Sequence, residues 1–321
     1  MNNKKTIITG STGLIGSALT KKLSNNKLYV TSGDLTDCQK IYQTFLEWSV
    51  IANGGICKNV FHKLEEFDCF HLAARVGGVN ANMSYLGEFF TSNILINTNV
   101  LNAARMFKVR KLISLASTCI YPENASQPLK ECDLHDGWPH ESNYGYAFAK
   151  RMLDIQSKAY RDQYGCNFIV AIPTNVFGLN DNFNLENSHV IPGMIHKIYL
   201  AKINKQPILE LWGDGSQLRD FIFADDLCDA LVLVMENYDD KEPINIASGI
   251  DISIKEIAEL IQQNMEYDGK IIWSGDKTGI QKKSVNIDKI TALGWKPKTN
   301  IKEGIKIVVK WFRDHYESVR K

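Results

Sequence analysis

The segment from Asn143 to Lys150 carries a tyrosine and a lysine four residues apart, Tyr146 and Lys150. On a helix this spacing puts both side chains on one face. A lysine cation close to a phenol lowers the phenol pKa, which suits a proton donor or acceptor for a carbonyl/alcohol couple. About one such pair is expected by chance in a chain of this composition, so the neighbouring residues must decide whether it does chemistry.

Ser117 follows the run Lys111 to Ala116, which predicts a strand. In open α/β sheets ligands bind beyond the carboxyl ends of the strands, so Ser117 is placed to hydrogen-bond the same oxygen as Tyr146. A solvent-facing loop hydroxyl is the alternative interpretation.

Three glycines, Gly10, Gly13 and Gly16, stand between a short β-branched run and a helical pattern. At such a turn the free N–H groups and the dipole of a helix attract a diphosphate, and glycine lets the backbone approach it. The spacing G-x-x-G-x-x-G departs from the usual G-x-G-x-x-G, and a plain tight turn is the alternative. Asp34 follows Gly16 by nearly the interval of about 20 residues typical of an adenosine-side carboxylate. The pattern therefore favours a bound dinucleotide.

The elements that must position these residues alternate between strands and helices. Strands are predicted at 6–9, 28–31, 67–72, 111–116 and 167–172, and helices after residue 13 and at 38–48, 89–107 and 144–164. This alternation indicates βαβ units and an α/β fold with a doubly wound parallel sheet. We predict a dinucleotide-binding domain at 1–173 and a smaller α/β substrate lobe at 174–321, between which the chain could cross.

Composition narrows the function further. The 321 residues are 44% hydrophobic and 23% charged, with a net charge of +1, so no global field would hold nucleic acid or an anionic membrane. Seven cysteines without a Cys-x-x-Cys pair argue against a disulfide framework and a structural zinc site, and we expect no metal. With no apolar run of about 18 residues, a cytoplasmic protein is expected.

Together these residues resemble the extended short-chain dehydrogenase/reductases, and among them the enzymes that both epimerise and reduce a GDP-linked keto sugar. The resemblance rests on the glycine motif, on Ser117 and on Tyr146-x-x-x-Lys150. It also rests on segments along most of the chain, namely His71–Ala74, Val76–Gly78, Ser117–Pro122, Pro173–Gly178, Asp181–Asn184, Asn187–Pro192 and Trp212–Gly215.

The resemblance implies 3,5-epimerisation of GDP-4-keto-6-deoxy-D-mannose followed by NADPH-dependent reduction at C4, which gives GDP-L-fucose. Cys119 would be the base of the epimerisation and His189 the acid. Ser117 and Tyr146 would hold the C4 oxygen, and Tyr146, tuned by Lys150, would supply the final proton. Taken alone, a lone cysteine is more often inert core and a lone histidine at a helix start a cap or a surface group. The sequence shows no neighbour that lowers the pKa of Cys119.

The resemblance also implies ligand contacts. NADPH would be held by Gly10, Ser11, Thr12, Gly13, Leu14, Ile15, Gly16, Asp34, Leu35, Leu72, Ala73, Ala74, Leu115, Ala116, Ser117, Tyr146, Lys150, Pro173, Thr174, Asn175, Val176 and His189. The nucleotide sugar would be held by Val76, Asn175, Lys197, Trp212, Arg219 and Thr278.

Three departures from the family pattern stand out. Thr278 replaces an acidic residue, and Thr12 and Ser32 stand where some members carry arginines for the 2′-phosphate of NADP. The stretch from Trp48 to His62 reads as a surface insertion.

The helices at 89–107 and 144–164 resemble those that pair in family homodimers, so we expect a homodimer. A 4-epimerase or a 4,6-dehydratase of the same fold is the nearest alternative. A dehydratase is expected to carry Thr-Asp-Glu where this chain has Ser117-Thr118-Cys119, and a 4-epimerase lacks the Cys119/His189 pair. A non-catalytic dinucleotide-sensing regulator is the alternative from another class, and it would not need all five catalytic residues.

Overall fold

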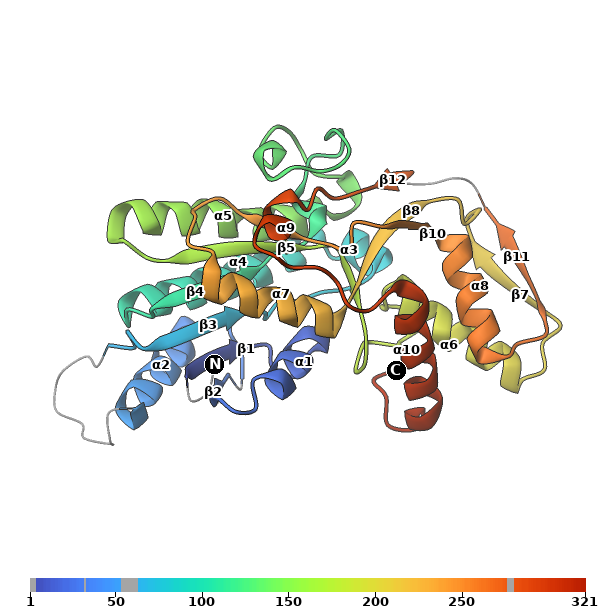
Figure 1. Cartoon of the computed structure of the whole chain (residues 1–321), viewed down its shortest axis with the longest axis horizontal. Coiled ribbons are helices and arrows are strands. Elements are labelled where there is room, and N and C mark those ends of the chain that lie inside the picture. The colour runs from blue at the N-terminus through green and yellow to red at the C-terminus, as the bar shows by residue number, and fades with distance from the viewer. Residues whose placement is uncertain (1–3, 32, 53–62, 276–279) are drawn as a thin grey trace.

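The computed structural model describes residues 4–31, 33–52, 63–275 and 280–321. Its centre is a six-stranded parallel sheet of order β2-β1-β3-β4-β5-β9. The strands are β1 (Lys5–Thr9), β2 (Lys27–Val30), β3 (Phe67–His71), β4 (Lys111–Leu115), β5 (Phe168–Pro173) and β9 (Ile244–Ile246). The predicted doubly wound parallel sheet is confirmed, because helices cover both of its faces (Figure 1).

Alternation along the strands divides the core between the two faces. Ile7 and Leu112 pack on one face, while their neighbours Ile8 and Ile113 pack on the other. The first face is covered by α2 (Cys38–Ala52), α4 (Leu86–Met106) and α5 (Tyr144–Tyr164), and the second by α1 (Leu14–Lys22), α7 (Ala224–Asn237) and α9 (Asp288–Ala292). Helix α5 ends at Gly165, whose φ of 69° permits the left-handed cap.

The second lobe is built from shorter elements on the right of Figure 1. Its helices are α6 (Val190–Ile203), α8 (Ile254–Met265) and α10 (Ile301–His315), which share one apolar core. Strand β8 (Leu218–Phe223) pairs with β6 (Asn175–Phe177), β10 (Asp251–Ser253) and β12 (Lys282–Lys283), while β7 (Ile208–Trp212) pairs with β11 (Lys270–Ser274). The short helix α3 (Val79–Ser84) precedes α4.

The chain crosses between the lobes after residue 173. Helix α7 and strand β9 return to the first sheet, where β9 pairs with β5 through Ile172↔Asn245. The second lobe is therefore not one continuous segment, and the loops that cross between the lobes border the carboxyl edge of the first sheet.

One expectation about the stretch after Glu47 is wrong. Trp48 and Ser49 are buried in the last turns of α2, and the Trp48 ring lies edge-on to Tyr29, with 6.1 Å between centroids. The apolar residues of this segment continue the helical period of α2, so the helix runs on to Ala52 and packs against the core. Residues 53–62 lie outside the described part of the chain.

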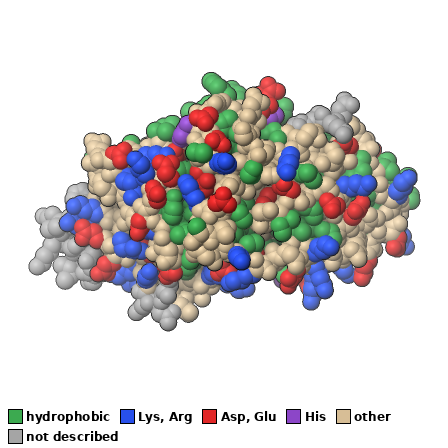
Figure 2. All heavy atoms as spheres, turned by 45° about the horizontal axis from the view of Figure 1, so that its top comes forward, with side chains coloured by type: hydrophobic (Ala, Val, Ile, Leu, Met, Phe, Trp, Pro, Cys, Tyr) green, Lys and Arg blue, Asp and Glu red, His purple; other side chains and the backbone are tan. Residues whose placement is uncertain are grey.

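Charge is mixed over the surface. Figure 2 shows basic and acidic side chains interspersed on the face in view. Within the described residues, no helix has the length and apolarity that a bilayer crossing requires. The same residues hold no cluster of three or more His, Cys, Asp or Glu side chains suited to a metal ion.

Candidate active site

The glycine turn joins β1 to α1. Gly10 has φ 73°, and a Cβ there would come within 2.8 Å of the Ala73 backbone; a Cβ on Gly16 would come within 2.0 Å of the Gly10 carbonyl oxygen. These two glycines serve close packing of the chain itself. A Cβ on Gly13 would meet only the Gly10 carbonyl, at 3.5 Å, so the space beside Gly13 is left open by the protein. Gly13 is also the N-cap of α1 and has no side chain to cap its N–H groups, which suits a diphosphate.

The predicted cofactor residues gather at the carboxyl edge of the sheet. They follow β1 (Gly10–Gly16), β2 (Asp34 and Leu35), β3 (Leu72–Ala74), β4 (Leu115–Ser117) and β5 (Pro173–Val176). The Asp34 carboxylate accepts hydrogen bonds from the backbone N–H and the hydroxyl of Thr36, and these lower its pKa. The position of each residue fits a dinucleotide laid across this edge.

A buried chain of hydrogen bonds ties this edge to α5. His71 contacts the Thr9 hydroxyl through Nδ1 at 2.8 Å and the Asn97 side chain through Nε2 at 3.1 Å. Asn97 in turn donates to the carbonyl of Ala149, the residue before Lys150. Desolvation, together with the nearby Lys150 cation, lowers the pKa of His71 to about 3, so His71 is neutral. The sequence analysis missed this network, although His71 stands in one of the segments that carry the resemblance.

Tyr146 and Lys150 lie on the buried side of α5, as their spacing predicts. Lys150 is buried and donates from Nζ to the Leu115 carbonyl at 2.8 Å, and desolvation lowers its pKa to about 8. The pKa of Tyr146 is raised, first by desolvation and then by the charge of Cys119. The expected lowering of the Tyr146 pKa by Lys150 is therefore wrong for the free chain, because desolvation dominates. Tyr146 keeps its proton at neutral pH.

Cys119 lies in the 3-10 turn Thr118–Ile120, directly after Ser117. Desolvation raises the pKa of its partly buried thiol, against the charges of Lys283 and Lys150 and a hydrogen bond from Ser117. Lys283, on β12, is a neighbour that sequence reasoning missed, since nothing sets its Lys282-Lys283 dipeptide apart. The structure thus brings Ser117, Cys119, Tyr146 and Lys150 into one group.

Arg151 is a second residue that sequence reasoning missed. Its buried guanidinium donates from Nε to the Ile120 carbonyl at 2.8 Å and from Nη1 to the Gly137 carbonyl at 2.7 Å. It also lies over the Phe148 ring, 5.1 Å from the centroid. Helix α5 therefore fixes the turn that carries Cys119. The only sign of this role in the sequence was that Arg151 directly follows Lys150.

His189 reaches the site from the other lobe, as the N-cap residue of α6. The backbone N–H of Gly78 donates to the carbonyl of Asn187, and a Cβ on Gly77 would touch the Phe89 ring, which itself lies edge-on to Tyr146. This chain of contacts brings the His189 segment against the Tyr146 side of the site. His189 is exposed, yet enough protein surrounds the ring for desolvation to lower its pKa.

The predicted substrate residues are spread more widely. Arg219 is half-buried on β8, directly opposite Lys283 on β12, and desolvation lowers its pKa. Val76 and Asn175 are exposed, in the turn after β3 and at the start of β6. Lys197 lies on α6, and Trp212 ends β7 with 71% of its surface exposed. No hydrogen bond or ring contact among the described residues links these last two to Cys119. Thr278 lies outside the described residues.

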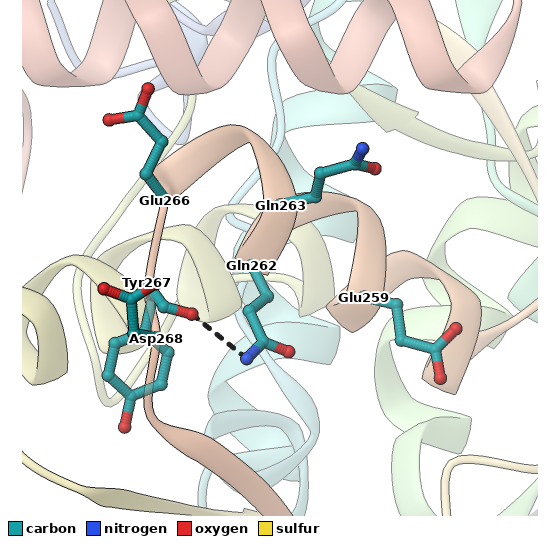
Figure 3. A pocket seen from close by; sticks show the side chains of 6 residues that line it. All are labelled: Glu259, Gln262, Gln263, Glu266, Tyr267 and Asp268. Carbon is teal, nitrogen blue, oxygen red and sulfur yellow. Dashed lines mark hydrogen bonds between the residues drawn. The ribbon is translucent and has the colours of Figure 1, made fainter.

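The hollow drawn in Figure 3 lies elsewhere, at the end of α8. It has a volume of about 320 Å³ and is lined by polar and acidic side chains, and Gln262 donates to the Tyr267 carbonyl across it. It holds neither a nucleophile nor a cation, so it does not suit an anionic nucleotide.

Known proteins resemble this chain in both sequence and fold. The family model described as "NAD dependent epimerase/dehydratase family" matches residues 6–247. A GDP-L-fucose synthase of Dictyostelium discoideum is 40% identical over 99% of this chain and 98% of its own. The crystal structure of a GDP-L-fucose synthetase from Naegleria fowleri bound to NADP is 32% identical, with a TM-score of 0.88 over 100% of this chain and 97% of its own. A GDP-mannoheptose C4 reductase from Campylobacter jejuni with NADP bound is 30% identical, with a TM-score of 0.85 over 98% and 99%.

Proposed function

The chain belongs to the NAD dependent epimerase/dehydratase family, and from this premise we propose that it converts GDP-4-keto-6-deoxy-D-mannose into GDP-L-fucose. The conversion combines epimerisation at C3 and C5 with NADPH-dependent reduction at C4. The observation that carries the proposal is the group of Ser117, Cys119, Tyr146 and Lys150 at the carboxyl edge of the sheet, with His189 entering from the other lobe.

Epimerisation needs a base, an acid and a holder for the enolate oxygen. The C4 ketone acidifies the hydrogens on C3 and C5. The Cys119 thiolate takes such a proton, the electron pair moves onto the C4 oxygen, and protonated His189 returns a proton to the carbon from the opposite face. The hydroxyl groups of Ser117 and Tyr146 donate to the C4 oxygen while it carries negative charge.

Reduction uses the same oxygen. When bound, NADPH supplies the hydride for C4, and the open space at Gly13 and the uncapped start of α1 fit its diphosphate. Tyr146 then protonates the alkoxide, for which its raised pKa is suitable, because the phenol reaches this step still protonated. The Lys150 cation, held on the Leu115 carbonyl, stabilises the phenolate that remains.

The charged part of the substrate requires cations. Arg219 lies opposite Lys283 in the strand register, and its fork of donors matches a diphosphate. We assign Lys197 and Trp212 to the nucleotide half, with Trp212 offering an exposed aromatic face, and Val76 and Asn175 to the sugar half. We also assign Thr278 to the substrate contacts, on the basis of its position in the sequence alone.

A homodimer through α4 and α5 is part of the proposal. These two helices pack on each other and leave several large apolar side chains at least two-fifths exposed, namely Phe90, Leu95, Met152, Ile155 and Tyr164. Burying this face against a second copy would remove an apolar patch from water. The six described cysteines are all free, which suits a reducing cytoplasm.

The test is to incubate the purified protein with freshly made GDP-4-keto-6-deoxy-D-mannose and NADPH and to identify the sugar by NMR. GDP-L-fucose with stoichiometric NADPH loss supports the proposal. The likeness to a GDP-mannoheptose C4 reductase makes reduction without epimerisation the second candidate. NADPH loss with a sugar unchanged at C3 and C5 would favour that candidate and remove the roles of Cys119 and His189.

A further inference from the structure

A thiol with a raised pKa is a weak base at neutral pH unless a cation stabilises its thiolate. Desolvation around Cys119 disfavours its thiolate, so nearby positive charges must compensate if the thiolate is to act as a base. Three cations interact electrostatically with this sulfur: Lys150 and Arg151 on α5, and Lys283 on β12.

Two of these cations are already engaged. The Lys150 ammonium donates to the Leu115 carbonyl, and the Arg151 guanidinium donates to the carbonyls of Ile120 and Gly137. Lys283 differs, because no carboxylate among the described residues forms an ion pair with it, although it is mostly enclosed by protein. Removing an ammonium group from water is unfavourable, so a buried lysine of this kind is expected to have a negatively charged partner.

The backbone holds Lys283 in this place. Strand β12 pairs with β8 in the register Lys283↔Arg219. The residues after it are fastened to the loop that follows the Cys119 turn: Leu129 donates to the Ser284 carbonyl at 2.9 Å and accepts from the Asn286 N–H at 3.0 Å. A segment of the second lobe is thereby anchored beside a turn of the first.

Neighbouring residues on a strand face opposite sides, and β12 uses both. Lys282 forms an ion pair with Asp251, 3.3 Å apart, and lines a surface hollow together with Gln127 and Ser284. Lys283 therefore belongs to the other side of the strand, and it interacts electrostatically with Cys119 and Arg219. Its pKa is lowered to about 8, chiefly by desolvation, so it is mostly protonated at neutral pH.

We infer that the Lys283 ammonium is the positioning charge that stabilises the thiolate of Cys119, so that the second lobe activates a base carried by the first. This inference deepens the proposed function and rests on it. The groups that act on Cys119 are then Ser117 through its hydrogen bond and Lys150, Arg151 and Lys283 through charge, with Arg219 beside Lys283. Tyr146 feels the charge of Cys119 in turn. Among these groups, Lys283 is the cation of the second lobe that has no bound partner in the part of the chain that the structure describes.

The first test measures alkylation of Cys119 by iodoacetamide as a function of pH, in protein loaded with NADP, with the modified peptide quantified by mass spectrometry. Lys283→Met is expected to move the midpoint to higher pH and to slow alkylation at pH 7.5 about tenfold, since one pKa unit changes the thiolate fraction tenfold. Lys283→Arg keeps the charge and is expected to stay within about twofold of the parent. Lys282→Met, on the opposite side of the same strand, is the matched control and should leave the profile unchanged.

The second readout is incorporation of solvent deuterium at C3 and C5 with NADP in place of NADPH. Lys283→Met is expected to lower kcat for exchange about tenfold and to shift its pH profile in the same direction as alkylation. An unchanged alkylation profile combined with a raised KM for the nucleotide sugar would overturn the inference and make Lys283 a substrate contact. If the parent protein exchanges no deuterium, the proposed function fails, while the alkylation series still decides whether Lys283 acts on Cys119.

Discussion

Arg151 donates a 2.8 Å hydrogen bond from Nε to the carbonyl oxygen of Ile120, so the helix that carries Tyr146 and Lys150 also fixes the turn that carries Cys119. The groups for reduction and the base of the epimerisation are therefore held by one element. Reaction at a single C4 oxygen requires this, because both half-reactions use the same donors.

Replacing Arg151 with methionine is expected to separate these functions. The carbonyls of Ile120 and Gly137 would lose a charged donor, so we expect a loss of about 2–4 kcal/mol in unfolding free energy and about tenfold slower deuterium exchange at C3 and C5. Arg151→Lys should recover part of both. Urea unfolding and NMR exchange rates measure the two effects. Unchanged exchange in a folded Arg151→Met protein would show that the turn is fixed without this side chain.

Gly13→Ala and Gly16→Ala test the cofactor turn as a pair. The added methyl group at position 13 meets only the Gly10 carbonyl at 3.5 Å, so this variant should fold with an unchanged Tm yet bind NADPH at least tenfold more weakly. At position 16 the methyl group would lie 2.0 Å from the same oxygen, and the variant should be strongly destabilised. Calorimetry for Tm and fluorescence titration for Kd measure these effects. Normal NADPH affinity in Gly13→Ala would place the diphosphate elsewhere.

Tyr146→Phe is expected to remove reduction and to spare epimerisation. The final proton comes from this phenol, so NADPH oxidation should fall about 10²–10⁴-fold. Deuterium exchange should persist, slowed by no more than about tenfold, because Ser117 still holds the oxygen. Single-turnover absorbance and NMR on the same samples compare the two steps. Equal loss of both would mean that Tyr146 is required for holding the oxygen rather than for the proton.

The pH profile of epimerisation should be broad. Desolvation lowers the pKa of His189 below its usual value of about 6.5 and raises that of Cys119 above its usual 8.5 or so. The reactive form, thiolate with imidazolium, is then a small fraction that stays constant between the two pKa values and falls outside them. Exchange rates from pH 5 to 10 should show this plateau. In His189→Gln the residual rate should follow the Cys119 thiolate alone, so the plateau and the fall at high pH should disappear, and an alkaline fall that survives in that variant would assign it to another group.

Asp181 should make stability depend on pH. Its carboxyl is buried, Oδ2 has no hydrogen-bond partner among the described residues, and desolvation raises its pKa to about 7. Because the folded chain then binds a proton that the unfolded chain releases near pH 4, the contribution of this group to stability is full below pH 4 and is lost as pH rises through 7. Asp181→Asn should therefore be more stable than the parent at pH 8, by about 1–3 kcal/mol, and should gain less at pH 5. Urea unfolding at both pH values measures this difference, and an equal difference at both would contradict it.

Local patterns in the sequence determined a large part of this protein. The β-branched run before Gly10, the helical period after Gly13 and the alternation up to Ile172 follow from residues that are close along the chain. Their predicted elements were confirmed within a few residues, and α5 begins and ends where expected. The shared face of Tyr146 and Lys150 follows from the helical period in the same way.

The tertiary structure alone decided which distant residues meet. Lys283 comes beside Cys119 because β12 pairs with β8 and is fastened to Leu129, and no local pattern records a contact between segments so far apart. The same holds for the return of β9 to the first sheet. The tertiary structure also decided the protonation states. The spacing of Tyr146 and Lys150 predicted a lowered pKa for the Tyr146 phenol, but desolvation in the folded protein raises it. Spacing along a chain sets geometry within one element, whereas desolvation depends on everything that packs around the group.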